Sequence, residues 1–472
     1  MCERGDDIDG EAAYDYSGYS VSLSADGATL AVGAHYNDGA GSYAATRAFC
    51  VGPVEETWVQ RGDDIDGEDA DDQSGGSVSL SADGTTLAVG ARGNDGAGDS
   101  AGHARVSRGL RRRDGVQRGD DIDGEAAYDQ SGGSVSLSAD GTTLATWKQR
   151  GDDIDGEAAY DDSGVSVSLS ADGTTLAVGA VYNGGAGSYA GHARRGDDID
   201  GEDADDQSGG SVSLSADGTA LAVGALFNDG GPGSNAATRV FAWHSDDETW
   251  VQRGDDIDGE AAGDLSGYSV SLSADGTALA VGAIFNDGGG TDAGHARVFA
   301  WDPNEWKQRG EDIDGEAAFD YSGISVSLSA DGTALAVGAV YNGGAGSNAG
   351  HARRGDDIDG EAAGDLSGYS VSLSADGTAL AVGAIYNDGG GNNAGHARVF
   401  AWDSVDETWV QRGDDIDGED ADDQSGISVS LSADGTTLAV GARYNGGGGN
   451  SAGSTRVYTI APSSTPAPTT AV

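Results

Sequence analysis

An acidic hexapeptide recurs along the chain and is the strongest candidate for chemistry. One copy reads Asp255-Asp256-Ile257-Asp258-Gly259-Glu260, which places four carboxylates within six residues and a glycine at the bend. Ca²⁺ prefers oxygen ligands, so the hexapeptide predicts a calcium-binding loop. The candidate ligands in this copy and in the copy nearest the C-terminus are Asp255, Asp256, Asp258, Glu260, Asp414, Asp415, Asp417 and Glu419.

The spacing of this hexapeptide is not that of an EF-hand. When the two are aligned on Gly259, the first loop position falls on Gly254, and the twelfth, where a bidentate Glu belongs, falls on Leu265. The alternative interpretation is a solvated acidic turn without an ion, because blocks of like charge usually face water. Both interpretations stay open at the level of the sequence.

Histidine also recurs, in the tetrapeptide Gly-His-Ala-Arg. The copies are His103, His192, His295, His351 and His396. A zinc site needs several ligands close together, and no second ligand accompanies each histidine in the sequence. We therefore expect these histidines to pack on strands or to form hydrogen bonds with loops, and not to bind zinc.

The tripeptide Arg-Gly-Asp occurs in eight of nine repeats, with Arg309-Gly310-Glu311 as the exception. Integrins read this tripeptide in matrix proteins, but recognition needs an exposed loop, and a short match without structural context is weak. Here the tripeptide falls at the end of a predicted strand. We expect its arginine to be structural.

Catalytic groups do not stand out against the repeats. An active site needs distinct groups that converge on one substrate, whereas the reactive side chains here recur. There is no single Ser/His/Asp set, and the glycine-rich residues 446–449 lack the Lys-Ser/Thr of a phosphate-binding loop. The sequence therefore predicts a protein that is not an enzyme.

The elements that carry these residues belong to nine tandem repeats. The arginines that open the acidic segments are Arg4, Arg61, Arg118, Arg150, Arg195, Arg253, Arg309, Arg354 and Arg412. Full repeats are 56 to 58 residues long, and three are shortened to 32, 45 and 45. Such units bury their apolar faces against neighbours, so residues 1–460 are predicted to form one domain. Residues 461–472, rich in Ser, Thr and Pro, are interpreted as a tail or linker.

Each full repeat predicts four short antiparallel strands. Residues 270–273 alternate apolar and small polar side chains, and Asp275-Gly276 supplies a hairpin turn before a second strand over residues 277–283. Residues 296–301 and, in the preceding unit, residues 250–254 read as the third and fourth strands. Four strands per repeat indicate one propeller blade.

The fold class is thus an all-β propeller of about seven to nine blades. The shortened repeats are expected to lose outer strands. Residues 3–8 can complete a last blade whose third strand lies over residues 456–460, which would close the ring as a strap. Because nine units exceed the usual four to eight, we expect an irregular or partly open ring.

Two motifs recur in each full repeat: residues 266–272 read Ser-Gly-Tyr-Ser-Val-Ser-Leu, and residues 281–283 read Val-Gly-Ala. Through them the repeat resembles the FG-GAP repeat, the blade unit of integrin α-subunit propellers, which has Phe-Gly-x-Ser-Val at the first position and Gly-Ala-Pro at the second. The resemblance covers residues 4–460 and implies an extracellular binding module, often with calcium in blade loops. A competing resemblance is the WD-repeat propeller, through Ser-x-Asp-Gly-x-x-Leu-Ala and a strand that ends in Trp-Asp.

Composition narrows the partners. Acidic residues outnumber basic ones 80 to 25, giving a net charge of −55, so nucleic acid and anionic membranes are poor partners. The sequence has no run of about 20 apolar residues, and direct membrane insertion is not expected. No signal peptide opens the chain, whose first unit lacks the Trp-Val-Gln that precedes the arginine elsewhere, so we expect the true start to lie upstream.

The leading hypothesis is a noncatalytic binding or adhesion scaffold, extracellular or on the cell surface, assisted by calcium, with a protein or glycan ligand. One alternative is an intracellular, WD-like platform for protein interactions. Another is a recently duplicated repeat array, or a gene-model fragment, with no dedicated function.

Overall fold

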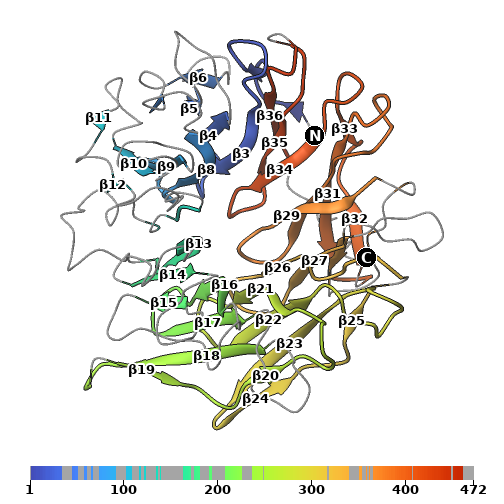
Figure 1. Cartoon of the computed structure of the whole chain (residues 1–472). Coiled ribbons are helices and arrows are strands. Elements are labelled where there is room, and N and C mark those ends of the chain that lie inside the picture. Colours follow the sequence, from blue (N-terminus) through green and yellow to red (C-terminus); the bar gives the residue numbers. More distant parts are fainter. Residues whose placement is uncertain are drawn as a thin grey trace, which may run out of the picture.

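The structure is a computed structural model in which the described elements are all β-strands (Figure 1). It describes residues 2–34, 45–51, 58–60, 65–66, 74–91, 103–108, 116–117, 122–123, 134–136, 139, 163–171, 175–180, 191–193, 208–225, 237–247, 249–315, 318–339, 350–352, 358, 361, 365–406, 408–447 and 450–460. Across these ranges, no helix is long and apolar enough to cross a membrane. The tail over residues 461–472 lies outside them.

Within the described ranges, the strands form eight antiparallel sheets that surround a common centre, which confirms the all-β propeller (Figure 1). The innermost strands are β3 (Ser17–Leu23), β8 (Ser74–Leu80), β13 (Ser163–Leu169), β16 (Ser208–Leu214), β21 (Ser266–Leu272), β26 (Ser325–Leu328), β29 (Ser367–Leu373) and β34 (Ser425–Leu431). The second strands are β4 (Thr29–Ala34), β9 (Thr86–Ala91), β14 (Leu176–Ala180), β17 (Ala220–Ala225), β22 (Ala278–Ala283), β27 (Leu335–Gly338), β30 (Ala379–Ala384) and β35 (Thr437–Ala442).

The outer strands follow the same order. The third strands are β5 (Ala45–Val51), β10 (His103–Arg108), β15 (Gly191–Ala193), β18 (Ala237–His244), β23 (His295–Asp302), β28 (Gly350–Ala352), β31 (His396–Asp403) and β36 (Ser454–Thr459). The fourth are β1 (Cys2–Glu3), β6 (Trp58–Gln60), β11 (Val116–Gln117), β19 (Thr249–Gln252), β24 (Glu305–Gln308) and β32 (Thr408–Gln411). Two-residue strands from the acidic segments also pair with third strands: β2 (Ile8–Asp9), β7 (Ile65–Asp66), β12 (Ile122–Asp123), β20 (Ile257–Asp258), β25 (Ile313–Asp314) and β33 (Ile416–Asp417).

The hairpin between the first and second strands is fixed by its own side chains. Between β21 and β22, Ser273 Oγ donates a hydrogen bond to Asp275 Oδ1 at 2.8 Å, and the Thr277 amide donates to the same oxygen at 3.0 Å. Gly276 adopts φ 64°, a conformation that side chains disfavour. The predicted Asp-Gly turn is therefore present, and its geometry recurs around the ring.

The serines that alternate along the innermost strand connect one blade to the next. Ser269 Oγ donates to the carbonyl of Gly323 at 2.8 Å, and Ser271 Oγ accepts a hydrogen bond from the Leu328 amide at 3.1 Å. Both partners belong to the following blade. These serines therefore form hydrogen bonds between blades with backbone groups that would otherwise lack a partner.

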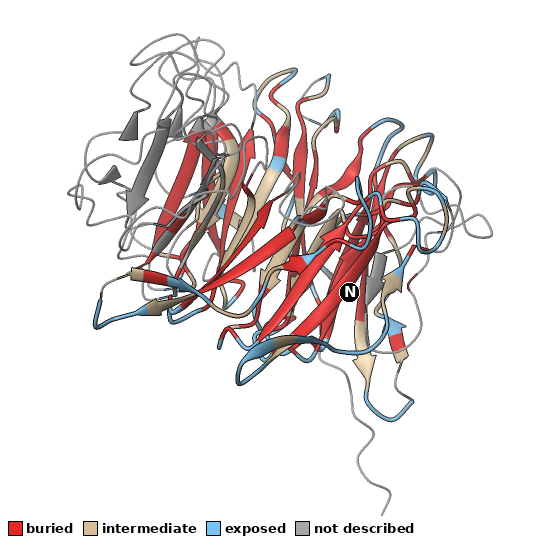
Figure 2. Ribbon diagram, turned by 60° about the horizontal axis from the view of Figure 1, so that its bottom comes forward, coloured by how far each residue is buried: buried red, intermediate tan, exposed pale blue. Residues whose placement is uncertain are grey.

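The hydrophobic core consists of the interfaces between blades. In one such cluster, Ala222, Val240 and Ile257 of one blade pack against Leu279 and Phe299 of the next. Figure 2 shows that buried residues run along the strands while exposed residues gather in the connecting loops. Each unit therefore depends on its neighbours, as expected of a repeat array.

A closed circle of backbone hydrogen bonds joins the hairpin turns. Each turn contributes one alanine, whose amide donates to the carbonyl of the alanine in the following repeat at 2.8 to 3.2 Å. The members are Ala25, Ala82, Ala139, Ala171, Ala216, Ala274, Ala330, Ala375 and Ala433, and the amide of Ala433 returns to the carbonyl of Ala25. The expected partly open ring is wrong at this level, because even the shortest repeat supplies its alanine.

The ends of the domain meet in one sheet. β1 pairs with β36 through Cys2 and Thr459, and β2 pairs with β36 through Ile8 and Thr455. This confirms the predicted strap. The sheets β13-β14-β15 and β26-β27-β28 have three strands among the described residues, in agreement with the expected loss of outer strands from the 45-residue repeats.

Candidate functional site

The acidic segment crosses from one blade to the next. Ile257, within β20, is buried in the cluster that joins the two blades, and the carboxylates on either side of it remain at the surface. Residues 260–265 then lead directly into the innermost strand β21. The segment is therefore a linker held in place by its isoleucine, with its acidic side chains displayed at the junction.

The predicted ligands of one segment face different surroundings. Asp255 and Asp414 are exposed. Asp256 and Asp415 are half-buried, and each accepts a hydrogen bond at 2.6 Å from a glutamine side chain of the preceding strand.

Asp258 and Asp417 pair with the third strand of a blade, whereas Glu260 and Glu419 lie beside the loop that follows a second strand. Burial, followed by the charge of the aspartate two residues before it, raises the pKa of Asp258 and of Asp417. Glu260 and Glu419 are exposed, and each accepts a hydrogen bond at 3.3 Å from an asparagine amide.

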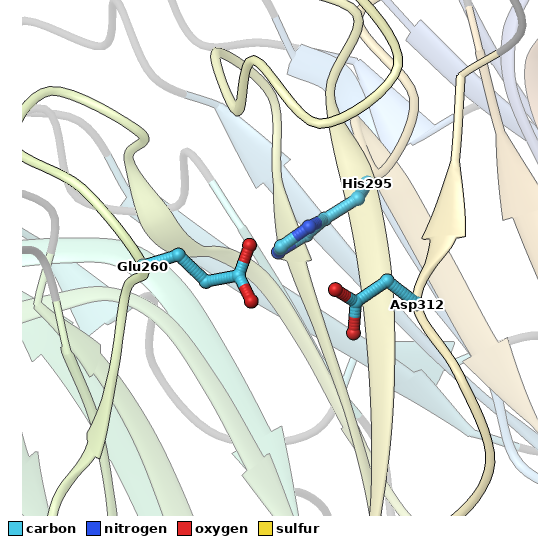
Figure 3. Close-up of side chains that lie close together, drawn as sticks. All are labelled: Glu260, His295 and Asp312. Carbon is cyan, nitrogen blue, oxygen red and sulfur yellow. The ribbon is translucent and has the colours of Figure 1, made fainter.

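Histidine brings two of these carboxylates into a cluster. Glu260, His295 and Asp312 have ligand atoms that all lie within 4.8 Å of one another, and Figure 3 shows both carboxylates turned toward the imidazole. Glu361, His396 and Asp415 repeat the arrangement. Of the predicted ligands, Glu260 and Asp415 thus enter clusters, each with a carboxylate from a different acidic segment.

The histidines fit one of the two roles expected from the sequence, because His295 and His396 pack as the first residues of the third strands β23 and β31. His295 and His396 are fully buried, and neither ring nitrogen of either residue has a hydrogen-bond partner. Neither forms the expected loop hydrogen bond, and each has carboxylates beside it that come from separate segments. The sequence hides these neighbours because pairing of β25 with β23, which places Asp314 opposite His295, is required to bring them together.

The imidazoles are neutral at physiological pH. Burial, reinforced by the positive charge of Arg297, lowers the pKa of His295 to about 4. Burial and Arg398 lower the pKa of His396 to about 4 in the same way. The nearest carboxylate oxygens, of Asp314 and of Glu361 and Asp417, lie 3.9 to 4.0 Å from the Nδ1 atoms, which is too far for a hydrogen bond.

An asparagine positions the glutamate of each cluster. Asn286 Nδ2 donates to Glu260 Oε2 at 3.3 Å and to the buried Asp264 Oδ2 at 2.9 Å. The backbone amide of Gly288 donates to Asn286 Oδ1 at 2.8 Å, which fixes the orientation of the side-chain amide. Asn286 and Asp264 were not among the predicted site residues. The recurring Asn-Asp/Gly-Gly loop was a signal for Asn286.

A second group of side chains gathers near the centre of the ring. Tyr19, Tyr268 and Tyr369 are the third residues of the innermost strands β3, β21 and β29, and they are 36%, 38% and 42% exposed. Burial raises the pKa of Tyr369, the charge of Arg443 opposes the shift, and the neighbouring Tyr19 and Tyr268 add to it. We call these three residues the central tyrosines. They lie at the end of the innermost strands that the acidic linkers enter.

The arginine of the repeated tripeptide is packed between blades. The guanidinium of Arg253 lies 4.5 Å from the ring centre of Trp301 and 5.5 Å from that of Trp306. Its Nη1 donates to the carbonyl of Gly276 at 2.9 Å. These contacts agree with a structural role for this arginine.

Comparison with known proteins supports the fold. Residues 359–400 match the family model of the FG-GAP repeat. The C-terminal WD40 domain of Sif2 is similar at 13% identity and a TM-score of 0.51, over 97% of this chain and 98% of that one. The Dos1 propeller is similar at 12% identity and a TM-score of 0.50, over 96% and 95%. No curated protein matches the sequence. The chain is therefore a β-propeller, and its residues 359–400 are similar to the FG-GAP repeat.

The expectation that the chain is not an enzyme is corrected by the same comparison. Similar solved structures include a Bacteroides uniformis protein provisionally named a 6-phosphogluconolactonase, at 14% identity and a TM-score of 0.45, over 83% of this chain and 96% of that one. A likeness this distant assigns no reaction to the present chain.

Proposed function

We propose that this propeller is an extracellular or cell-surface interaction scaffold that binds a protein or glycan at its central tyrosines. The observation that carries the proposal is the equivalent position of Tyr19, Tyr268 and Tyr369. They come from different repeats, yet each is the partly exposed third residue of an innermost strand that borders the centre of the ring. Tyrosine is enriched at interaction surfaces because it offers a large apolar ring and a polar hydroxyl.

The surrounding charge favours a ligand with positive groups. The acidic linkers enter the innermost strands immediately before the tyrosines, as in Glu260 to Asp264 ahead of Tyr268. Carboxylates around an aromatic patch attract cationic partners and repel anionic ones. The net charge of −55 and the FG-GAP match support an extracellular location with calcium at the acidic linkers.

The test replaces Tyr268 and Tyr369 with glycine, the residue that other repeats carry at this position, as Gly76 and Gly210 do. Binding is measured on a glycan panel and with arginine- and lysine-rich peptides. We expect a ligand found with the native protein to bind the double variant about 10-fold or more weakly, because aromatic anchors dominate interface energy.

The matched control is Val405→Ala, which changes an apolar residue that is 86% exposed at the outer turn between β31 and β32. This variant should bind as the native protein does. Equal binding by the native protein and the tyrosine double variant would place the interaction surface elsewhere.

A further inference from the structure

The two histidine clusters have the composition and the geometry of a metal site. Each combines a glutamate from the linker that enters a blade, a histidine at the start of that blade's third strand, and an aspartate from the linker that leaves it. In Figure 3, the side chains of Glu260, His295 and Asp312 approach one another from three separate segments. The second cluster, Glu361, His396 and Asp415, reproduces this arrangement in another blade.

The buried imidazoles point to a ligand. A buried polar group without a hydrogen bond is costly, and each of these histidines leaves both ring nitrogens unpaired. Asp417 Oδ1 is also buried and unpaired, at 4.0 Å from His396 Nδ1. At this separation the two atoms do not form a hydrogen bond with each other.

The charge of the cluster favours the same conclusion. Glu361 and Asp415 offer carboxylate oxygens that lie within 4.8 Å of each other and of a ring nitrogen of His396. Two neighbouring carboxylates disfavour each other's ionised form, and a bound cation removes that repulsion.

The donor set selects the class of ion. Ca²⁺ and Mg²⁺ are bound by oxygen ligands, whereas a neutral imidazole with carboxylates suits the divalent transition metals. We propose that Glu260, His295 and Asp312, and likewise Glu361, His396 and Asp415, each bind a divalent transition-metal ion such as Zn²⁺. The ion joins the two linkers that flank one blade. The proposal depends neither on the ligand of the central tyrosines nor on calcium.

Other repeats of the same chain supply a natural comparison. Ala237 stands opposite Asp258 and Ser454 opposite Asp9, where His295 stands opposite Asp314. Neither of these two blades has a metal-ligating group of three among the described residues. Alanine at the histidine position is therefore compatible with the blade fold.

The experiment uses the full chain with His295→Ala and His396→Ala combined, and titrates it with Zn²⁺ in the presence of excess Ca²⁺. We expect the double variant to bind two fewer zinc ions than the native protein, one for each cluster. Co²⁺, used as a spectroscopic probe, should give visible absorption in the native protein that decreases in the variant. The control is His244→Ala, which removes an exposed histidine at the end of β18 and should leave both readouts unchanged.

A second variant keeps the test decisive if loss of the buried histidines impairs folding. Glu260→Gln with Glu361→Gln changes side chains at the surface and should weaken zinc binding at these sites by about 10-fold or more. Zinc stoichiometry and cobalt absorption that stay native in either double variant would overturn the proposal. So would displacement of the zinc by calcium, because the imidazole would then not determine the choice of ion.

Discussion

At the scale of the residue, one position shows how a single side chain changes its surroundings. The first residue of the third strand is His295 in β23, Ala237 in β18 and Ser454 in β36. Where histidine stands, two carboxylates face a neutral imidazole. Where serine stands, the corresponding acids Asp7 and Glu419 act on each other without it. The same backbone therefore holds different electrostatic environments.

Asp7 allows a test of this environment through pH. Burial raises the pKa of Asp7 to about 7, a hydrogen bond with Glu3 and the charge of Glu419 add to the shift, and Arg456 opposes it. The folded-state pKa lies above the unfolded value, so the folded protein binds the extra proton and its stability falls as pH rises from about 4 to about 7.

We therefore expect the melting temperature of the native protein to fall more between about pH 5 and about pH 8 than that of Asp7→Asn, measured by circular dichroism. The difference between the two proteins isolates Asp7 from the other carboxylates. Parallel curves would show that the Asp7 carboxyl titrates as it does in the unfolded chain. Asp255→Asn, at an exposed position, serves as the control.

At the scale of the element, the strands long enough to show an alternating pattern were predictable, and the two-residue strands were not. The predicted residues 270–273, 277–283 and 296–301 fall almost entirely within β21, β22 and β23. β20, Ile257–Asp258, lies in the segment interpreted as an acidic turn, because two residues carry no alternation. The histidine clusters were hidden for the same reason, since pairing of these short strands brings Asp312 to His295.

The alternating serines form a second kind of contact that the sequence of one repeat does not predict. Small residues on the inner strands allow adjacent blades to approach closely, as Gly282 does to the carbonyl of Gly323. The hydrogen bond from Ser269 to Gly323 adds a directional contact that no single repeat reveals, because its acceptor belongs to the following unit.

Gly282 provides the test at this scale. A Cβ atom at this position in β22 would overlap the carbonyl oxygen of Gly323 and the Ser269 hydroxyl. We expect Gly282→Ala to lower the free energy of unfolding by about 1 to 3 kcal/mol, measured by urea denaturation, because backbone atoms cannot move aside easily.

Gly263→Ala is the comparison, because no atom lies within 4 Å of a Cβ there and only its φ of 91° opposes a side chain. Its effect should be smaller than that of Gly282→Ala. If both variants were as stable as the native protein, the close contact between adjacent blades would be refuted.

At the scale of the whole molecule, the net charge of −55 opposes compaction. If calcium binds the acidic linkers of the folded state, it adds binding free energy to folding, about 2.7 kcal/mol per site at a calcium concentration 100 times the dissociation constant. We expect the melting temperature to be several degrees higher in millimolar calcium than in chelator. Sodium chloride at matched ionic strength is the control, and equal melting in calcium and sodium would exclude specific binding.

The circle of alanine hydrogen bonds has a consequence for changes in the number of repeats that the gene encodes. Every junction uses an alanine amide as donor and an alanine carbonyl as acceptor, and the shortest repeat joins the circle through Ala139. Unequal recombination that adds or deletes a whole repeat therefore leaves each remaining turn beside an equivalent partner. The array can lengthen or shorten by complete units while each new neighbour meets the same chemistry.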